Sequence, residues 1–145
     1  MRSADAVVEA RVIERVGTRD VRGYEQQRVP VSFTDSRVRV SNVLKGDVER
    51  DLVVAQVGKD GDPAQNYPEF PILRPGADVV LFLVDVSTVA IHAQAPSRYA
   101  VIAPVGLLAV DGQRLTSRAS GHASSDRAIS LTLDQFRQVV RTAAR

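Results

Sequence analysis

The chain has 145 residues, of which 44% are hydrophobic and 25% are charged, a composition typical of one globular domain and not of a disordered segment. Dedicated nucleic-acid-binding proteins usually carry a larger and more clustered basic excess than its formal net charge of +2. The sequence contains no cysteine, which excludes disulfides, thiolate nucleophiles and cysteine-based metal sites.

The first residues include no apolar segment of the kind found in a secretory signal peptide. Either the protein is cytoplasmic, or a leader has been removed from this chain. No apolar run approaches the roughly 20 residues that a membrane-spanning helix needs. We therefore expect no transmembrane segment.

The N-terminal third alternates apolar and polar residues as strands do. Residues 4–16 fit a strand that ends in a turn at residues 17–20, although valines four positions apart would also suit a helix. Residues 28–33 alternate again. Because Pro30 cannot donate a ladder hydrogen bond, we expect this piece at an edge or outside the sheet.

Two further strands are predicted at residues 36–44 and 52–57. In the first, Val38 and Val40 are expected to face inward and the intervening arginines outward. The alternation of inward and outward residues shifts by one position at Asn42-Val43, which predicts a β-bulge there. The connection is short, so the two strands are expected to be antiparallel neighbours.

Residues 79–84 are the centre of the predicted core. These six consecutive apolar residues lie between two aspartates and follow a Pro-Gly pair, which is typical of a strand buried on both faces. The preceding connection, residues 58–78, is rich in proline and glycine. A connection of this length without structure of its own is either functional or mobile.

The C-terminal half continues with shorter elements. An irregular stretch at residues 87–98 precedes predicted strands at 99–103 and 107–110. Asp111-Gly112 is a strong signal for a two-residue hairpin turn, which needs positive φ. Residues 117–130 contain few apolar side chains and are expected to be loose.

The clearest helix is predicted at about residues 132–144. Thr132 and Gln135 have the spacing of a capping box, and Leu131 and Phe136 that of a hydrophobic staple. One apolar stripe predicts that the helix packs on the sheet, namely Leu133, Phe136, Val139, Val140 and Ala143. The arginines spaced four apart are expected on its solvated face, namely Arg137, Arg141 and Arg145.

These elements predict a single domain over residues 1–145, all-β with one C-terminal helix. The motif series resembles a group of uncharacterised bacterial exported domains across residues 4–116, through Val43-Leu44-Lys45-Gly46, Pro75-Gly76, Leu81-Phe82-Leu83, Tyr99, Gly106-Leu107 and Asp111-Gly112. Such domains resemble a small Greek-key OB-like barrel, broadly similar to netrin or metalloproteinase-inhibitor modules. The resemblance implies export to the cell envelope and supplies no catalytic residue. The disulfide-bearing relatives use bridges that this chain lacks.

No catalytic site is predicted. A serine at 87 or within 117–125 would need His92 or His122 as its base, but no G-x-S-x-G elbow is present. Both histidines lie in weakly patterned segments, and we expect them to be exposed in loops. A catalytic base also needs a rigid scaffold, and these segments are not predicted to be rigid.

No metal or cofactor site is predicted either. The long connection contains a small cluster of oxygen ligands, Asp60, Asp62, Asn66 and Glu69. Pro63 and Ala64 break the pattern of a calcium-binding loop, and a solvated acidic loop is the simpler interpretation.

The leading functional hypothesis is a non-enzymatic binding or interaction module for an unknown protein or envelope ligand, exported to the cell envelope. The alternative is a cytoplasmic OB-type nucleic-acid-binding domain, and a hydrolase is a distant third. Arg37 and Arg39 face outward on one predicted strand, but Asp47, Glu49 and Asp51 follow closely and cancel much of their field. Nucleic acid is therefore not the expected partner.

The predicted partner-binding residues are Tyr67, Phe70 and Arg74 in the connection at residues 58–78. Aromatic side chains and arginine are enriched at interface hot spots, and prolines lower the entropic cost of binding. The competing interpretation is that Phe70 and Ile72 plug the open end of the barrel. Exposure of the three side chains distinguishes the two.

Overall fold

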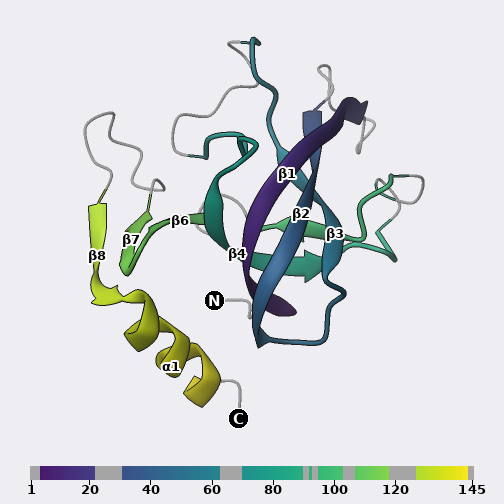
Figure 1. Cartoon of the computed structure of the whole chain (residues 1–145). Coiled ribbons are helices and arrows are strands. Elements are labelled where there is room, and N and C mark those ends of the chain that lie inside the picture. The colour runs from purple at the N-terminus through teal and green to yellow at the C-terminus, as the bar shows by residue number, and fades with distance from the viewer. Residues whose placement is uncertain are drawn as a thin grey trace.

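The computed structural model describes residues 4–21, 31–62, 70–89, 92, 95–102, 107–117 and 127–143, with the backbone alone for 117 and 127–130. This part of the chain forms eight strands and one helix (Figure 1), which are β1 (Ala6–Val21), β2 (Val31–Lys45), β3 (Asp51–Val57), β4 (Asp78–Asp85), β5 (Tyr99–Val101), β6 (Leu107–Asp111), β7 (Arg114–Ser117), β8 (Arg127–Thr132) and α1 (Leu133–Ala143).

Five of these strands close into a ring. Their order is β1-β2-β3-β5-β4, and a further pairing of β1 with β4 completes the circle. The β3–β5 pair is parallel and the other pairs are antiparallel. Beyond β4 the sheet continues through β6, β7 and β8 to the helix (Figure 1). The prediction of an all-β, barrel-like domain with one C-terminal helix is confirmed.

The central strand β4 is buried on both faces, as its composition predicts. Leu81 and Leu83 point into the ring, where they join a core of aliphatic side chains from β1, β2 and β3. Val80 points the other way, into a second core that includes Leu108 of β6 and Leu115 of β7. Leu81, Leu83 and Val80 are each fully buried. Burying both faces of one short strand explains why it lacks the usual polar alternation.

The first hairpin is longer than predicted. The expected turn at residues 17–20 does not exist, because β1 stays paired with β2 from Gly17 opposite Asp35 to Val21 opposite Val31. Of the piece predicted to lie at an edge, residues 28–30 lie outside the described residues, and Val31 and Ser32 have ladder partners in β1 alone. From Phe33 onward, β2 has β1 on one side and β3 on the other. Main-chain pairing thus overrides the local turn signal.

The register of β2 follows the sequence pattern. Val38 and Val40 are buried, and Arg37 and Arg39 are exposed. Irregularities in the β1–β2 pairing lie on both sides of the Asn42–Val43 step, where the shift in alternation predicts a bulge. The predicted irregularity is present, but it falls at Ser41 and Leu44, one residue to either side of the predicted step.

Two glycines are required by turns. Gly46 has φ +86° after β2, and a Cβ there would lie 2.5 Å from the main-chain oxygen of Asp5. Gly112 has φ +61° in the β6–β7 hairpin, in which Asp111 pairs with Arg114. The predicted hairpin is confirmed, with Gly112 and Gln113 as its central residues, one position later than expected. Glycine at the first central position is what a type II′ turn favours.

The helix begins next to the predicted cap. The Gln135 amide N–H donates to Thr132 Oγ1 at 3.2 Å, and the Thr132 amide N–H donates to Gln135 Oε1 at 2.9 Å, so the capping box is confirmed. Of residues 117–130, expected to be loose, 118–126 lie outside the described residues. Residues 127–130 form most of β8, because main-chain pairing with β7 needs no apolar side chain. The described helix is not long and apolar enough to cross a membrane.

The helix packs on a narrower face than predicted. Phe136 lies edge-on to Phe82, with 6.0 Å between the ring centroids, and Val140 joins the same core. Val139 is 53% exposed and Ala143 is also exposed, so the predicted stripe is wrong at these two positions. The packed face is centred nearer Leu133 and includes Arg137 instead.

Candidate functional site

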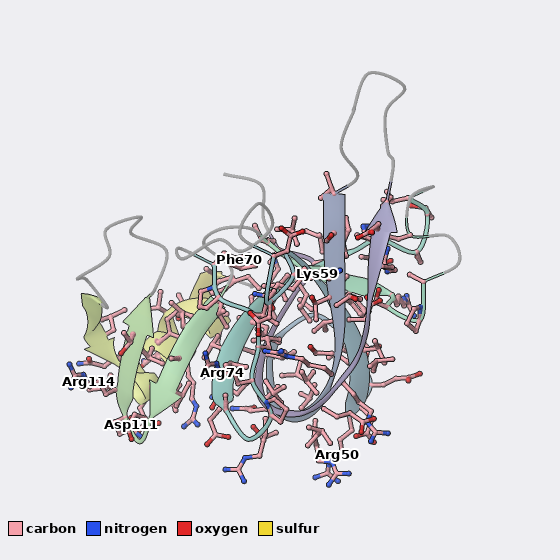
Figure 2. All side chains as sticks on the ribbon, turned by 90° about the horizontal axis from the view of Figure 1, so that it is seen from above. Arg50, Lys59, Phe70, Arg74, Asp111 and Arg114 are labelled. Carbon is pink, nitrogen blue, oxygen red and sulfur yellow. The ribbon has the colours of Figure 1, made fainter. Side chains whose placement is uncertain are left out.

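The three predicted contact residues do not form one exposed surface in the described structure. Phe70 is 2% exposed within the core of the ring, and Ile72 is 5% exposed, which fits the plug interpretation for these two side chains. Arg74 is exposed and lies apart from Phe70 (Figure 2). Tyr67 lies outside the described residues.

A buried side-chain amide helps to hold the segment around Phe70 to the ring. Gln56 on β3 is 1% exposed, and its Nε2 donates to the main-chain oxygen of Pro71 at 2.6 Å. Its Oε1 accepts from the Leu73 amide at 3.0 Å. Both polar groups of the side chain are therefore satisfied by the incoming connection. The sequence contains no local sign of this link, because Gln56 stands in an apolar strand.

Arg74 borders a small apolar pocket of about 180 Å³ between its own segment and strands β4 and β6. Leu107 and Ala109 supply part of its lining, as does Val79. Within the described part of the chain, the Arg74 guanidinium forms no ion pair. Arg74 therefore remains a candidate contact residue on its own, without Phe70.

A larger groove lies on the other side of the ring, beside β3. It has a volume of about 520 Å³ and runs between the β2–β3 connection, the start of β3 and the segment that leads into β5. We call it the acidic groove. Its lining residues are Asp47, Val48, Glu49, Asp51, Leu52, Val53, Pro96, Arg98 and Tyr99.

The charge of this groove is predominantly negative. Asp47, Glu49 and Asp51 face a single lining cation, Arg98. Arg98 is already engaged, because two of its nitrogens lie 3.3 Å from the carboxylate of Asp85. This hydrogen bonding raises the pKa of Arg98, and the nearby charge of Glu49 adds a smaller contribution.

The groove's carboxylates are at most weakly neutralised by the described residues. Asp51 lies 3.4 Å from Arg39, and both side chains are largely exposed, so this pair is weak. Asp47 and Glu49 form no ion pair within the same part of the chain. A cationic group entering the groove would therefore meet carboxylates that are only weakly neutralised.

A buried polar cluster holds one wall of the groove against the ring. Asp35 is 3% exposed and accepts hydrogen bonds from Arg19 Nε at 2.9 Å and Ser97 Oγ at 2.9 Å. Arg19 Nη2 also lies 2.8 Å from Nδ1 of His92. Ser97 stands between Pro96 and Arg98 of the groove. The cluster thus fixes the groove-lining segment to β1 and β2.

The expectation that His92 is an exposed loop residue is wrong. The side chain is only 6% exposed and packs edge-on to Phe33, with 4.9 Å between ring centroids. Burial, together with the charge of Arg19, lowers the pKa of His92, and Asp35 opposes this shift. Ser97 donates to Asp35 and not to the imidazole, so this pair is not a nucleophile with its base. His122 lies outside the described residues.

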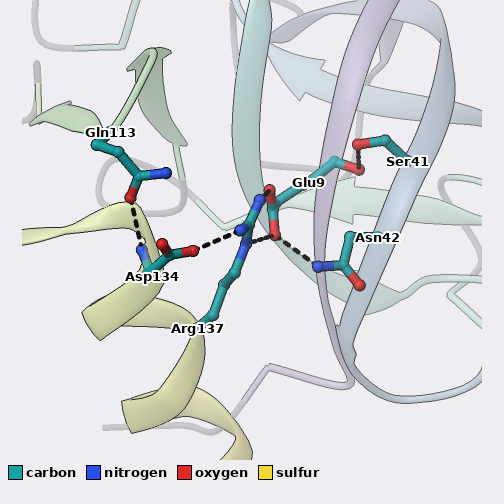
Figure 3. A network of polar contacts seen from close by, with 6 residues as sticks. All are labelled: Glu9, Ser41, Asn42, Gln113, Asp134 and Arg137. Atoms are coloured by element: carbon teal, nitrogen blue, oxygen red, sulfur yellow. Dashed lines mark hydrogen bonds and ion pairs between the residues drawn. The ribbon is translucent and has the colours of Figure 1, made fainter.

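A second polar network joins the helix to the ring (Figure 3). Glu9 on β1 is 7% exposed and receives two hydrogen bonds from Arg137, at 2.7 and 2.6 Å, and one from Asn42 at 2.9 Å. Arg137 also bonds Asp134, whose amide N–H donates to Gln113 Oε1. Hydrogen bonding to Glu9 raises the pKa of Arg137. The prediction that Arg137 lies on the solvated face is wrong.

The predicted oxygen-ligand cluster is only partly described. Asp60 lies 2.7 Å from Arg15 in an ion pair, and Asp62 also has a partner. Asn66 and Glu69 lie outside the described residues. Within the described ranges, no group of three or more acidic or histidine side chains is arranged to hold a metal ion.

Comparison with known proteins identifies no relative. No family model matches the chain, and searches of curated proteins and of solved structures return no match. The functional interpretation therefore depends on the geometry of the acidic groove.

Proposed function

We propose that this domain is a non-enzymatic binding module that holds a cationic segment of a partner in the acidic groove. The observation that carries the proposal is a groove of about 520 Å³ lined by three carboxylates and a single guanidinium, which also pairs with Asp85 outside the lining. Charge complementarity of this kind favours positively charged partners and disfavours negatively charged ones. The expected ligand presents lysine or arginine side chains.

The strand order supports a barrel of the OB type as the scaffold. In OB-folds, ligands bind at strands 2 and 3 and at the loops between strands 1 and 2 and between strands 4 and 5. The acidic groove borders β3 and the end of the β4–β5 connection. This correspondence favours the groove over the pocket beside Arg74 as the main binding site.

The charge of the groove argues against nucleic-acid binding, and the contacts of His92 argue against a hydrolase. A nucleic-acid-binding surface needs cations to neutralise phosphates, and Asp47 and Glu49, which form no ion pair in the described residues, would repel those phosphates. A serine hydrolase, the kind weighed from the sequence, needs a nucleophile hydrogen bonded to a base. The described histidine instead accepts a bond from Arg19 and packs on Phe33.

Export to the cell envelope is part of the proposal. It is supported by the resemblance of residues 4–116 to bacterial exported domains. The codons upstream of this segment in the gene test it, because a leader peptide or a lipobox encoded there is expected. An uninterrupted cytoplasmic open reading frame without either would contradict export and leave the groove proposal unaffected.

The binding proposal is tested by fluorescence anisotropy with a labelled peptide of alternating lysine and threonine. The double variant Asp47→Asn/Glu49→Gln should weaken binding by roughly three- to tenfold, since each exposed charge contributes a few tenths to about 1 kcal/mol. The matched control is Asp111→Asn, an exposed carboxylate at the β6–β7 turn (Figure 2). Equal binding by all three proteins, or tighter binding of a single-stranded oligonucleotide, would contradict the proposal.

A further inference from the structure

We infer that the cationic segment binds in extended form and adds as a strand to the free edge of β3. The inference rests on the proposed function and specifies how the ligand's backbone is held. The inference is based on the observation that β5 pairs with β3 only at Val54 and Ala55. The residues of β3 before Val54 line the acidic groove on the side where β5 is missing.

The hydrogen-bonding direction of these residues follows from the β2–β3 register. The Val40 amide donates to the Arg50 main-chain oxygen at 2.7 Å, and the Gly58 amide donates to the Ser32 main-chain oxygen at 2.8 Å. In an antiparallel pair, hydrogen-bonded positions alternate along each strand. Even-numbered residues of β3 therefore direct their main-chain groups toward β2.

Odd-numbered residues consequently face the opposite way. The main-chain groups of Asp51 and Val53 point away from β2. No described strand pairs with Asp51, whereas the parallel pairing of Val54 with Tyr99 engages the Val53 carbonyl and leaves its amide toward the acidic groove. An unpaired strand edge is a ready template for another extended chain. The groove supplies the room for that chain, between β3 and the segment of Pro96 to Tyr99.

The charges decide which chain can pair there. Glu49 and Asp51 flank the free edge, and Asp47 lies beside them. A second copy of this protein would bring the same carboxylates against one another, which is how natural proteins prevent edge-to-edge association. A lysine- or arginine-bearing segment meets the opposite charge. Side chains two residues apart in a strand share one face, so alternating basic residues suit the site best.

The experiment separates strand addition from simple charge attraction. Three peptides of alternating lysine and threonine are compared by anisotropy: one unmodified, one N-methylated at the lysines and one N-methylated at the threonines. Because main-chain N–H groups alternate in direction along a strand, only one methylation pattern blocks the bonds to β3. That peptide is expected to bind at least about tenfold more weakly than the other.

NMR-detected hydrogen exchange gives a second, independent measurement. Peptide binding should slow exchange at the amides of Asp51 and Val53, while the Leu52 amide, which faces β2, should change little. Equal binding of both methylated peptides, or slow exchange at Asp51 and Val53 without peptide through self-association, would overturn the inference. Binding that remains sensitive to Asp47→Asn/Glu49→Gln but not to methylation leaves the proposed function standing. Failure of every peptide to bind contradicts both.

Discussion

Nη2 of Arg19 lies 2.8 Å from Nδ1 of His92, and this contact defines the state of the imidazole. A guanidinium can only donate hydrogen bonds, so Nδ1 must accept and the ring is neutral. The same arginine bonds Asp35, which also holds Ser97. A proton on Nδ1 would replace an attractive contact with two adjacent cations. The cluster that attaches the groove-lining segment to the ring thus contains a group that titrates.

The first prediction concerns pH. Burial lowers the pKa of His92 below its ordinary value of 6.5, so the unfolded chain binds a proton more readily than the folded one. Stability should be fully present above about pH 6.5 and should fall as pH decreases toward the lowered pKa, by no more than about 1.4 kcal/mol per pH unit. Urea unfolding at several pH values between 7.5 and 5 measures this.

His92→Gln is the matched variant, because its side-chain oxygen can still accept from Arg19 but does not titrate. Its stability should vary less with pH than that of the wild type over this range. The pKa values of Asp78 and Asp85 are lowered from 3.8, so protonation of those carboxylates changes the stability only below about pH 4. A variant with the same pH dependence as the wild type would exclude His92 as the titrating group.

The second prediction concerns the ion pair between helix and ring. Arg137→Leu should cost about 3–5 kcal/mol, because it leaves the Glu9 carboxylate buried without its partner. The double variant Glu9→Leu/Arg137→Leu should be less destabilised than the single one, since no buried charge remains. Arg141→Leu, on the exposed side of the helix, should cost less than about 1 kcal/mol. Chemical denaturation would contradict this account if Arg137 and Arg141 behaved alike.

The third prediction concerns docking of the helix. Phe136 is partly buried against Phe82, so Phe136→Ala should destabilise the domain by about 2–4 kcal/mol, near the lower part of the range for a fully buried aromatic. Val139→Ala, which is 53% exposed, should change stability by less than about 1 kcal/mol. Thermal unfolding distinguishes the two. A loss under about 1 kcal/mol for Phe136→Ala would indicate that the helix is not docked.

The fourth prediction compares two glycines with similar backbone angles. Gly46→Ala should cost more than about 2 kcal/mol, because positive φ is combined with a collision of Cβ with the Asp5 oxygen at 2.5 Å. Gly76 has φ +87°, and a Cβ there would meet open space. Gly76→Ala should therefore lower the stability by only about 1–2 kcal/mol. Similar losses for both variants would show that the contact with Asp5 does not constrain the turn.

Much of the fold could be predicted because its signals are local. The β4 strand, the bulge near Asn42, the hairpin at Gly112 and the cap at Thr132 each depend on residues close together in the chain. Local signals failed where pairing partners decide the outcome. Residues 17–20 look like a turn but remain in β1, because β2 continues opposite them.

The candidate site could not be predicted in the same way. The groove joins the β2–β3 connection to a segment about 50 residues later, and the His92 cluster joins Arg19 to Ser97, 78 positions apart. No spacing rule connects such distant residues without the strand order. The free edge of β3 depends on where β5 begins, which alternation in the sequence does not reveal. The acidity of residues 47–51 was visible, but its location beside an unpaired strand was not.

The central claim is that the acidic groove is the binding site, and chemical-shift mapping of the ¹⁵N-labelled domain with the lysine–threonine peptide tests it most directly. The account predicts saturable shifts confined to residues 47–53 and 97–99, with little change at Asp111 or in the helix. Shifts centred on Arg74, or no shifts at peptide concentrations near the millimolar range of weak binding, would contradict it.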